Sequence, residues 1–426
     1  MKIHYLVGNF CKKVYDKINN TKFAEVSKMR KEDFTRNRKV GFVGTMLIVL
    51  NKTGKGINSA LRAYREAVKM EEEKYSKQAF SKGRMRIKWE AFREIFRMSV
   101  EEFYKGFPHE NYKGFRLSAV DGTKINLPYN EETKTEFGCQ KSSGDQIQSL
   151  GSCLYDVLNG ILIDAVPAPS DSNERKLAEK HMEYLDKIRT EKELILFDRG
   201  YPSSELMDFI DKKGFKYLMR ADETFTRGFI RRADGIDSVI THTFVKTKLE
   251  LTFRFIQLSL KDNEGNDVKE LLITNVFDDN FDIKDFEKLY HLRWGIETKY
   301  NDIKNKLQME SFSGTSPLAI KQDFYATMFL NNLASMMIIE NKEEIDRIHN
   351  SKENKYQYKA NVNAVISLLK ESVVEMLYTD SRYKKKKLLK KIYSEIQRAV
   401  VPVRPGRSFA RNKTHKSSKF PQNQRS

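Results

Sequence analysis

Three carboxylates occur in contexts that could bring them to one site. Asp121 and Asp198 each follow a short run that predicts a strand, Phe115–Val120 and Leu194–Phe197. A third acid, Glu297, lies in YHLRWGIETKYNDIK, whose spacing predicts a helix. A carboxylate at the end of a buried strand is costly unless it is paired or binds a cation. Three such groups together could hold two divalent metal ions, an arrangement suited to phosphodiester chemistry.

The predicted helix gathers further polar groups around Glu297. At 100° per residue, Tyr290, Arg293, Glu297 and Lys304 fall within an arc of about 60°, beside an apolar stripe. Such a face suits a carboxylate that holds a metal while its neighbours grip phosphate. Two simpler interpretations stay open: the helix face could be a solvated, salt-bridged surface, and either Asp could be a cap or turn residue.

The ends of this helix can also be predicted. Asp282 is a plausible N-cap with Asp285 three residues later, and Phe281 and Phe286 are placed as a hydrophobic staple. The helix should run without interruption to just before Ser313. Ser316 and Pro317 then begin the next helix, with Pro at its first position.

Three sequence blocks resemble the DDE transposases of bacterial insertion sequences, in the group with a Tyr-Arg-Glu-Lys signature (the insertion-sequence-four type). The blocks are DGTKINLP from Asp121, FDRGY from Phe197, and the signature Tyr290, Arg293, Glu297 and Lys304, in its RWxIE context. The resemblance spans roughly residues 115–345 and implies a ribonuclease H-like catalytic core.

The resemblance also implies a reaction. Asp121, Asp198 and Glu297 would be both the catalytic and the metal-binding residues, holding two Mg²⁺ ions that Mn²⁺ could replace. The protein would be a DNA transposase that performs cut-and-paste transposition through two-metal hydrolysis, a hairpin intermediate and strand transfer. Its partners would be double-stranded DNA, as inverted-repeat ends and as target. Because two ends need two active sites, a homodimer is expected on the DNA.

Candidate DNA-binding residues follow from the same resemblance and from charge. Tyr290, Arg293 and Lys304 would bind phosphates near the cleaved end, and Arg199 follows the second Asp. Two other functions stay open: a ribonuclease H-fold nuclease or resolvase that does not join strands, and a non-catalytic DNA-binding derivative of a transposase.

The net charge of +19 is concentrated at the C-terminus, since residues 381–426 contain fifteen Lys or Arg and one acid, Glu395. The end of this segment has no apolar periodicity and predicts a flexible basic tail, with Arg404, Arg407 and Arg411 as candidate DNA contacts. A solubilising or membrane-surface tail is the alternative.

Other classes of protein find little support. No run of about 18 apolar residues predicts a membrane span, and the N-terminus does not resemble a signal peptide. Cys11, Cys139 and Cys153 are isolated and lack the spacing of disulfide or zinc sites. We therefore expect a cytoplasmic protein, associated with the bacterial nucleoid when bound to DNA, and no membrane partner.

The predicted fold class is α/β: a ribonuclease H-like core interrupted by a β-rich insertion, with helical N- and C-terminal regions. Asp121 and Asp198 are 77 positions apart, whereas Asp198 and Glu297 are 99 apart, which implies an insertion in the second gap. The expected regions are a helical DNA-binding region (1–112), the first part of the core (113–221), the insertion (222–276), the second part of the core with the Glu297 helix (277–345), and a helical region with the basic tail (346–426).

Within the insertion, residues 243–248, 250–259 and 270–276 predict strands, and Asp262–Gly265 predicts a turn. In relatives such an insertion helps to hold the cleaved DNA end, in some with a Trp that stacks on a flipped base. This insertion contains no Trp, since the only two in the chain are Trp89 and Trp294.

Overall fold

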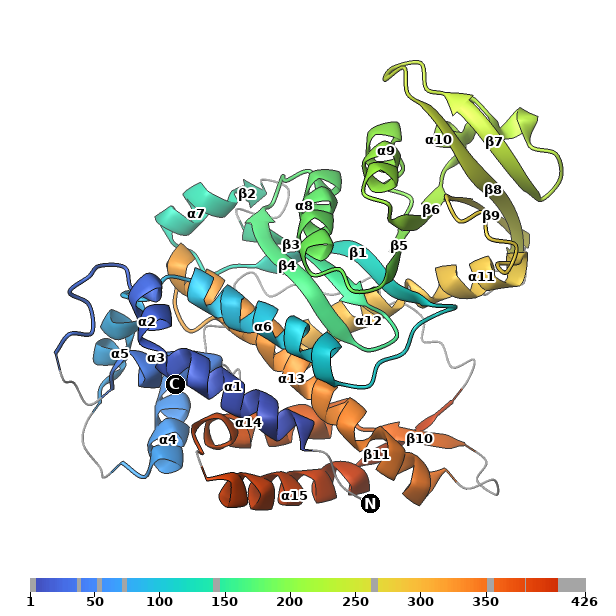
Figure 1. The fold of residues 1–426 in the computed structure, drawn as a ribbon. Coiled ribbons are helices and arrows are strands. Elements are labelled where there is room, and N and C mark those ends of the chain that lie inside the picture. The colour runs from blue at the N-terminus through green and yellow to red at the C-terminus, as the bar shows by residue number, and fades with distance from the viewer. Residues whose placement is uncertain are drawn as a thin grey trace. The chain divides into compact units, whose positions relative to one another are not determined.

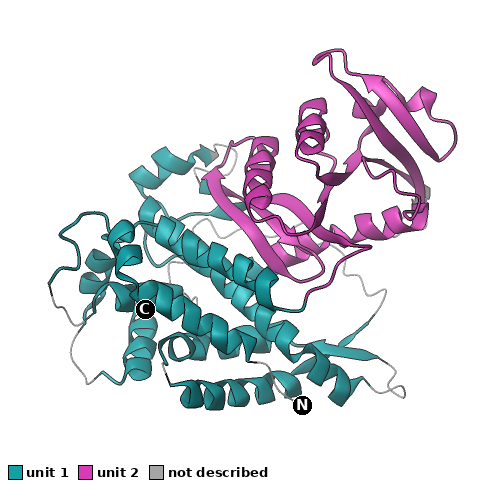
Figure 2. Ribbon diagram, viewed as in Figure 1, with its two compact units in different colours: residues 1–108, 124–149, 301–426 teal, residues 109–123, 150–300 magenta. Residues whose placement is uncertain are grey.

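The computed structural model describes residues 5–36, 40–51, 56–70, 75–140, 146–261, 267–350, 356–379 and 381–404. The chain forms two compact units (Figure 2). Unit 1 consists of residues 1–108, 124–149 and 301–426, and unit 2 consists of residues 109–123 and 150–300.

Unit 1 is mainly helical (Figure 1). Its helices are α1 (Leu6–Asn19), α2 (Thr21–Ser27), α3 (Phe42–Leu50), α4 (Ile57–Val68), α5 (Lys77–Arg84), α6 (Glu90–Gly106), α7 (Glu131–Phe137), the π-helical turn η3 (Asp302–Lys306), α13 (Pro317–His349), α14 (Val362–Tyr378) and α15 (Arg382–Arg398). Its short strands are β2 (Cys139–Gln140), β10 (Gln357–Ala360) and β11 (Val400–Val403).

The core of unit 1 is built around α13, which packs against α6, α14 and α3. Ser316 caps this helix and Pro317 occupies its first turn, as the sequence predicts. Nearly every residue from Ala319 to Met337 is buried, so this part of the helix is enclosed on all sides rather than on one face. Trp89 stacks on Tyr325 with ring centroids 5.5 Å apart. No helix among the described residues combines the length and the apolar composition that a membrane span requires.

Unit 2 contains most of a mixed sheet in which nine strands are described, in the order β2-β3-β1-β5-β6-β9-β8-β7, with β4 pairing β3. Its strands are β1 (Phe115–Asn126), β3 (Gln146–Asp156), β4 (Ile161–Pro169), β5 (Lys192–Phe197), β6 (Lys216–Ala221), β7 (Asp237–Thr243), β8 (Glu250–Lys261) and β9 (Asp267–Thr274), of which β1 and β3 continue into unit 1. Its helices are α8 (Glu174–Lys187), α9 (Ser204–Lys212), α10 (Glu223–Thr226), the 3-10 turn η2 (Ile230–Arg232), α11 (Ile283–Leu292) and α12 (Gly295–Asn301). The predicted mixed α/β fold with a large sheet and helices is confirmed.

The centre of the sheet is parallel. Strand β1 pairs with β5, and β5 pairs with β6, both in parallel register. Helices α8 and α9 follow β4 and β5 in the chain and provide the connections that parallel strands need. Strands β3 and β4 form a hairpin: they pair across a turn in which Gly160 has a φ of 72°, a left-handed value that favours glycine.

The insertion extends the same sheet, because β9 pairs antiparallel with β6 and continues to β8 and β7. The prediction of a strand at 243–248 is wrong. Strand β7 ends at Thr243, and the chain turns back through Lys248, whose φ is +61°. Phe244 and Leu249 are joined by a backbone hydrogen bond of 2.8 Å that closes this turn. The predicted turn at Asp262–Gly265 lies outside the described residues.

Candidate active site

Asp121 and Asp198 occupy equivalent levels of two adjacent parallel strands. The register of β1 and β5 pairs Phe115 with Lys192 and Ala119 with Leu196, an offset of 77 positions. Asp121 and Asp198 differ by the same 77 positions, so each lies two residues beyond the last described pair. Adjacent strands are about 4.8 Å apart, which brings the two carboxylates to one edge of the sheet.

The prediction that Asp121 ends its strand is wrong, because β1 continues to Asn126. What ends near Asp121 is the pairing with β5, whose last partner is Ala119. The Asp121 carboxylate accepts a hydrogen bond of 2.9 Å from the Gly122 amide. The Tyr300 hydroxyl donates a bond of 2.6 Å to the Asp121 carbonyl. Asp121 is therefore held by its own strand and by α12.

The electrostatic surroundings of Asp121 disfavour its charged form. Burial raises the pKa of Asp121 to about 7. The carboxylates of Glu297 and Glu174 also raise this pKa, whereas the Gly122 amide and the Arg293 guanidinium lower it. Asp121 therefore interacts electrostatically with Glu297 and Arg293, the two groups that the sequence predicts on one helix face. A cation near these carboxylates would favour their ionised forms.

Arg293 joins the other two predicted acids. Its guanidinium lies 3.2 Å from a Glu297 oxygen and 3.8 Å from an Asp198 oxygen. Only 3% of the Arg293 side chain is exposed, against 37% for Asp198 and 28% for Glu297. The Tyr290 hydroxyl donates a 3.4 Å bond to Asp198, and the Tyr290 ring lies 5.5 Å from the guanidinium. Tyr290, Arg293, Asp198 and Glu297 therefore form one connected group.

The acids do not yet form a closed ligand set. Among the described residues, no three His, Cys, Asp or Glu side chains are grouped closely enough to hold one metal ion. The group instead contains a buried cation, Arg293, whose charge partly offsets the two acids that it contacts.

The prediction of one continuous helix around Glu297 is wrong. Helix α11 ends at Leu292 and α12 begins at Gly295, and the amides of Arg293 and Trp294 bond three residues back, to Tyr290 and His291. The chain is therefore wound more tightly at Arg293 and Trp294 than in an α-helix. After α12 it widens into the π-helical turn η3. Since both irregularities depart from 3.6 residues per turn, the angles assumed for a regular helix do not hold as far as Lys304. The predicted capping box at Asp282 is confirmed.

Lys304 belongs to unit 1 and lies in η3, whereas Glu297 belongs to unit 2. Its ammonium donates a hydrogen bond to the carbonyl of Lys124. Burial lowers the pKa of Lys304, and the carboxylate of Glu310 opposes this effect. Glu310 in turn accepts a 3.1 Å bond from the Asn126 amide at the end of β1. Lys304 is therefore held against the end of β1 that belongs, like Lys304 itself, to unit 1.

Four further residues were predicted as DNA contacts: Arg199, Arg404, Arg407 and Arg411. Arg199 is exposed directly after Asp198. Arg404 follows β11, with its guanidinium 5.7 Å from the ring centroid of Tyr356. Arg407 and Arg411 lie outside the described residues.

Glu174 is a site neighbour that the sequence analysis missed. It is the first residue of α8, and its carboxylate carbon lies 3.3 Å from where a Cβ on Gly122 would be. The Tyr201 hydroxyl donates a 3.1 Å bond to Glu174. A side chain at Gly122 would also come within 2.9 Å of Leu150. An acid in a first helical turn is common for helix-dipole reasons, so nothing in the local sequence distinguishes Glu174.

The exposed side chain of Trp294 was also not singled out. It follows the buried Arg293, and 55% of it is accessible. Exposed tryptophan is unusual and offers an aromatic face on which a base can stack. An exposed Trp is therefore present beside Arg293 and Glu297, in the segment that contains the Tyr-Arg-Glu-Lys signature, whereas residues 222–276 contain none.

A second polar group in unit 2 resembles a hydrolase triad but has a structural role. Ser152 bonds to His181 at 2.9 Å, and His181 bonds to Asp164 at 2.9 Å. All three side chains are buried, with at most 1% exposed. Because no substrate can reach them, this network satisfies buried polar groups between the β3–β4 hairpin and α8.

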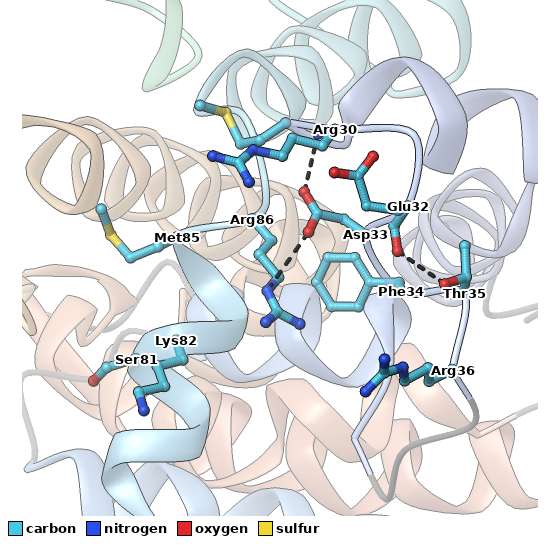
Figure 3. Close-up of a pocket in the computed structure, with 11 residues that line it drawn as sticks. Arg30, Glu32, Asp33, Phe34, Thr35, Arg36, Ser81, Lys82, Met85 and Arg86 are labelled. Atoms are coloured by element: carbon cyan, nitrogen blue, oxygen red, sulfur yellow. Dashed lines mark hydrogen bonds and ion pairs between the residues drawn. The ribbon is translucent and has the colours of Figure 1, made fainter.

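A cavity of about 800 Å³ lies in unit 1, away from all of these acids in the sequence (Figure 3). It is lined by two segments: Met29, Arg30, Glu32, Asp33, Phe34, Thr35 and Arg36, and Ser81, Lys82, Met85 and Arg86. Asp33 pairs with Arg86 at 3.5 Å and accepts a bond from the Arg30 amide. Within the described part of the chain, Arg36 and Lys82 form no ion pair, so the cavity has spare positive charge.

Comparison with known proteins identifies the family. Residues 112–333, half of the chain, match the family described as Transposase DDE domain. The transposase InsG of insertion sequence element IS4 from Escherichia coli strain K12 is 23% identical over 292 residues, which are 63% of this chain. The match covers 62% of InsG, less than two thirds of that relative.

A cryo-EM structure of the piggyBac transposase synaptic complex with hairpin DNA is a distant structural neighbour. It has a TM-score of 0.44 and 12% identity, and the alignment covers 95% of this chain and 86% of that one. This likeness is too low to carry an argument. The family match and the similarity to InsG confirm the resemblance predicted from the three sequence blocks: the chain belongs to the DDE transposases, of the IS4 type.

Proposed function

We propose that this protein is a DNA transposase that cuts an insertion sequence from its site and joins its 3′ ends to target DNA. The observation that carries the proposal is that one buried arginine contacts Asp198 and Glu297 and acts electrostatically on Asp121, which lies at the same level of the adjacent parallel strand as Asp198. The strand order β4-β3-β1-β5-β6, with the acids on adjacent parallel strands, supports a ribonuclease H-like core. The cytoplasm, where bacterial DNA is accessible, would be its place of action.

The donor chemistry of the site fits divalent metal ions. All three donors are carboxylates, which Mg²⁺ and Mn²⁺ prefer, and the raised pKa of Asp121 indicates a site where added positive charge would be stabilising. Asp121, Asp198 and Glu297 would hold two ions, which when bound would activate the attacking oxygen and stabilise the leaving one. The fit rests on donor types, since no closed ligand set is present among the described residues.

The protein's own residues would perform the remaining tasks. The Gly122 amide and the Tyr300 hydroxyl would hold the Asp121 carboxylate and backbone, and a side chain at Gly122 would require Leu150 and Glu174 to shift. Arg293 and Tyr290 would orient Asp198 and Glu297 and donate to the phosphate undergoing attack. After the first cut, the freed 3′ hydroxyl would replace water as nucleophile, through a hairpin at the DNA end. Two ends require two such sites, so a homodimer is proposed on the DNA.

The contacts of Arg293 and Lys304 predict different effects for their removal. Arg293 touches two of the acids, so Arg293→Ala should slow first-strand nicking by a factor on the order of 10², the usual cost of one catalytic donor. Among the described residues, Lys304 bonds to a strand carbonyl and to none of the three acids, so Lys304→Ala should slow nicking less than tenfold and cause nicked intermediates to accumulate. Denaturing gels of a labelled end would measure both steps. Equal loss of nicking in the two variants would contradict these separate roles.

We further propose that the N-terminal helices bind the element ends, and that the cavity of Figure 3 is one contact. Arg36 and Lys82, which form no ion pair with a described residue, provide positive charge, while Met29 and Met85, 50% and 42% exposed, offer apolar surface for deoxyribose. The double substitution Arg36→Gln, Lys82→Gln should weaken end binding and reduce its salt slope by about 0.9 per lost contact.

A matched control for this variant is Lys12→Gln, Lys105→Gln. It removes the same charge from α1 and α6, where each Lys pairs with a surface acid one turn away. Fluorescence anisotropy over a range of KCl concentrations would compare the two. If the control reduced the slope as much as the cavity variant, net charge and not the cavity would determine binding.

The proposed function is separated from its alternatives by the products formed. A transposase converts pre-cut ends and a target plasmid into joined molecules, whereas a simple nuclease or resolvase cuts DNA without joining it. A non-catalytic derivative would bind ends and form neither product. Purified full-length protein, Mg²⁺ and a labelled pre-cut end are sufficient for this assay.

A further inference from the structure

Helix α15 (Arg382–Arg398) has one buried face and one strongly basic exposed face. The buried face consists of Lys385, Leu389, Ile392, Tyr393 and Ile396. The exposed cations are Arg382, Lys384, Lys386, Lys387, Lys390, Lys391 and Arg398. At 100° per residue these cations span about 200° of the helix surface, and the buried residues fill about 100° on the other side.

The exposed charges repel one another. Lys386 and Lys390, and Lys387 and Lys391, are four residues apart, and Lys384 and Lys387 are three apart, spacings at which like charges destabilise a helix. Basic residues in the first turn are also unfavourably placed against the helix dipole, and that turn contains no acid.

The described part of the chain does not neutralise this face. Glu395 is the only acid of the helix, and it pairs with Arg398 at 3.6 Å. Lys384, Lys387, Lys390 and Lys391 form no ion pair with any described residue. The exposed lysines of α15 therefore repel one another, and binding of an external polyanion would reduce this repulsion.

The helix is held firmly in unit 1. The Tyr393 hydroxyl donates a hydrogen bond to Glu340 of α13, and the Tyr5 and Tyr393 rings stack with centroids 6.5 Å apart. A Cβ on Gly8 of α1 would lie only 2.8 Å from Leu389, which shows how closely the two helices approach. Because the backbone of α15 is already ordered by this packing, less conformational entropy of the helix would be lost when its lysines bind a partner.

We propose that the exposed face of α15 binds the phosphate backbone of duplex DNA without sequence preference. This proposal rests on the proposed function only in taking DNA as the polyanion. From Lys384 to Lys391 the helix rises about 10 Å, which spans about three phosphates of one strand at 3.4 Å each. A membrane is the poorer partner, because an interfacial helix needs a free apolar face and that of α15 is buried.

The test compares two variants of the full-length chain that each lose four positive charges. The first carries Lys384→Gln, Lys387→Gln, Lys390→Gln and Lys391→Gln. The control carries Lys12→Gln, Lys105→Gln, Lys176→Gln and Lys212→Gln, four lysines that each pair with an acid within one helical turn. Binding to a labelled duplex of arbitrary sequence is measured in EDTA at 50–200 mM KCl.

The α15 variant should bind at least tenfold more weakly at about 100 mM KCl, and its salt slope should fall by about 3, near 0.9 for each lost contact. For the control variant, the slope of log affinity against log salt concentration should fall by less than about 1. Thermal unfolding of the α15 variant should be unchanged or shifted upward, because repulsion is removed. Equal slopes for the two variants would overturn the proposal. Strand cleavage and joining by the α15 variant at saturating DNA report separately on the proposed function.

Discussion

Asp121→Asn should reduce Mg²⁺-dependent strand cleavage by at least about 10³-fold, a loss of about 4 kcal/mol in transition-state stabilisation. Asp198→Asn and Glu297→Gln should have effects of similar size. Asp121 and Asp198 lie at adjacent parallel strands, and Asp198 and Glu297 contact one arginine, so removal of any one charge should leave the others unable to hold two cations. The initial rate of nicking of a labelled element end, at saturating protein, measures the effect.

A matched control for these substitutions is Glu179→Gln. Glu179 lies on α8 and pairs with Lys176, on the same helix as Glu174. It should cleave at the parental rate. All four variants should bind the end with unchanged affinity, since the acids contribute no attraction to phosphate. A variant of the triad that cleaves at the parental rate would exclude that residue from the metal site.

The second large effect concerns the stability of the sheet that supports the site. Arg116 of β1 and Glu193 of β5 are register partners, and both are fully buried. Arg116→Met would leave the carboxylate buried without its partner and should lower the free energy of unfolding by about 3–5 kcal/mol. The double variant Arg116→Met, Glu193→Met should recover most of this loss, because neither charge then remains. Urea unfolding of the four proteins of this cycle is the measurement.

The loss should also depend on pH. Burial raises the pKa of Glu193, and Arg116 is the group that lowers it. Without Arg116 this pKa rises further above its unfolded value, so the folded protein binds more protons than the unfolded one. The stability of Arg116→Met should therefore be highest below the unfolded pKa of Glu and should fall as the pH rises. A loss that is the same at pH 5 and pH 8 would mean that Glu193 stays charged in the variant.

The sequence was sufficient for the predictions that depend on local chemistry. Asp121 and Asp198 could be singled out because a carboxylate beside a buried strand needs a partner, and the cap at Asp282 follows from the local residues alone. Asp121 and Asp198 are 77 positions apart, the same offset that relates paired residues of β1 and β5. This agreement shows that the two acids lie at the same level only because β1 and β5 pair in the structure. Strand pairing is set by the whole sheet, and no local pattern contains it.

The remaining differences arise where a regular element was assumed. The helix around Glu297 departs from 3.6 residues per turn at Arg293 and again in η3, so angles extrapolated from a regular helix do not hold as far as Lys304. Glu174 was missed because its proximity to Gly122 comes from the packing of α8 on the sheet.

The most direct test of the central claim is strand joining by the purified chain. Pre-cut labelled ends, a supercoiled target plasmid and Mg²⁺ should yield joined products with the parental protein. They should yield none with Asp121→Asn, whose binding to the ends is retained. Joined products from Asp121→Asn, or cleavage of uncut ends by the parental protein without any joining, would contradict the assignment of these residues to a transposase active site.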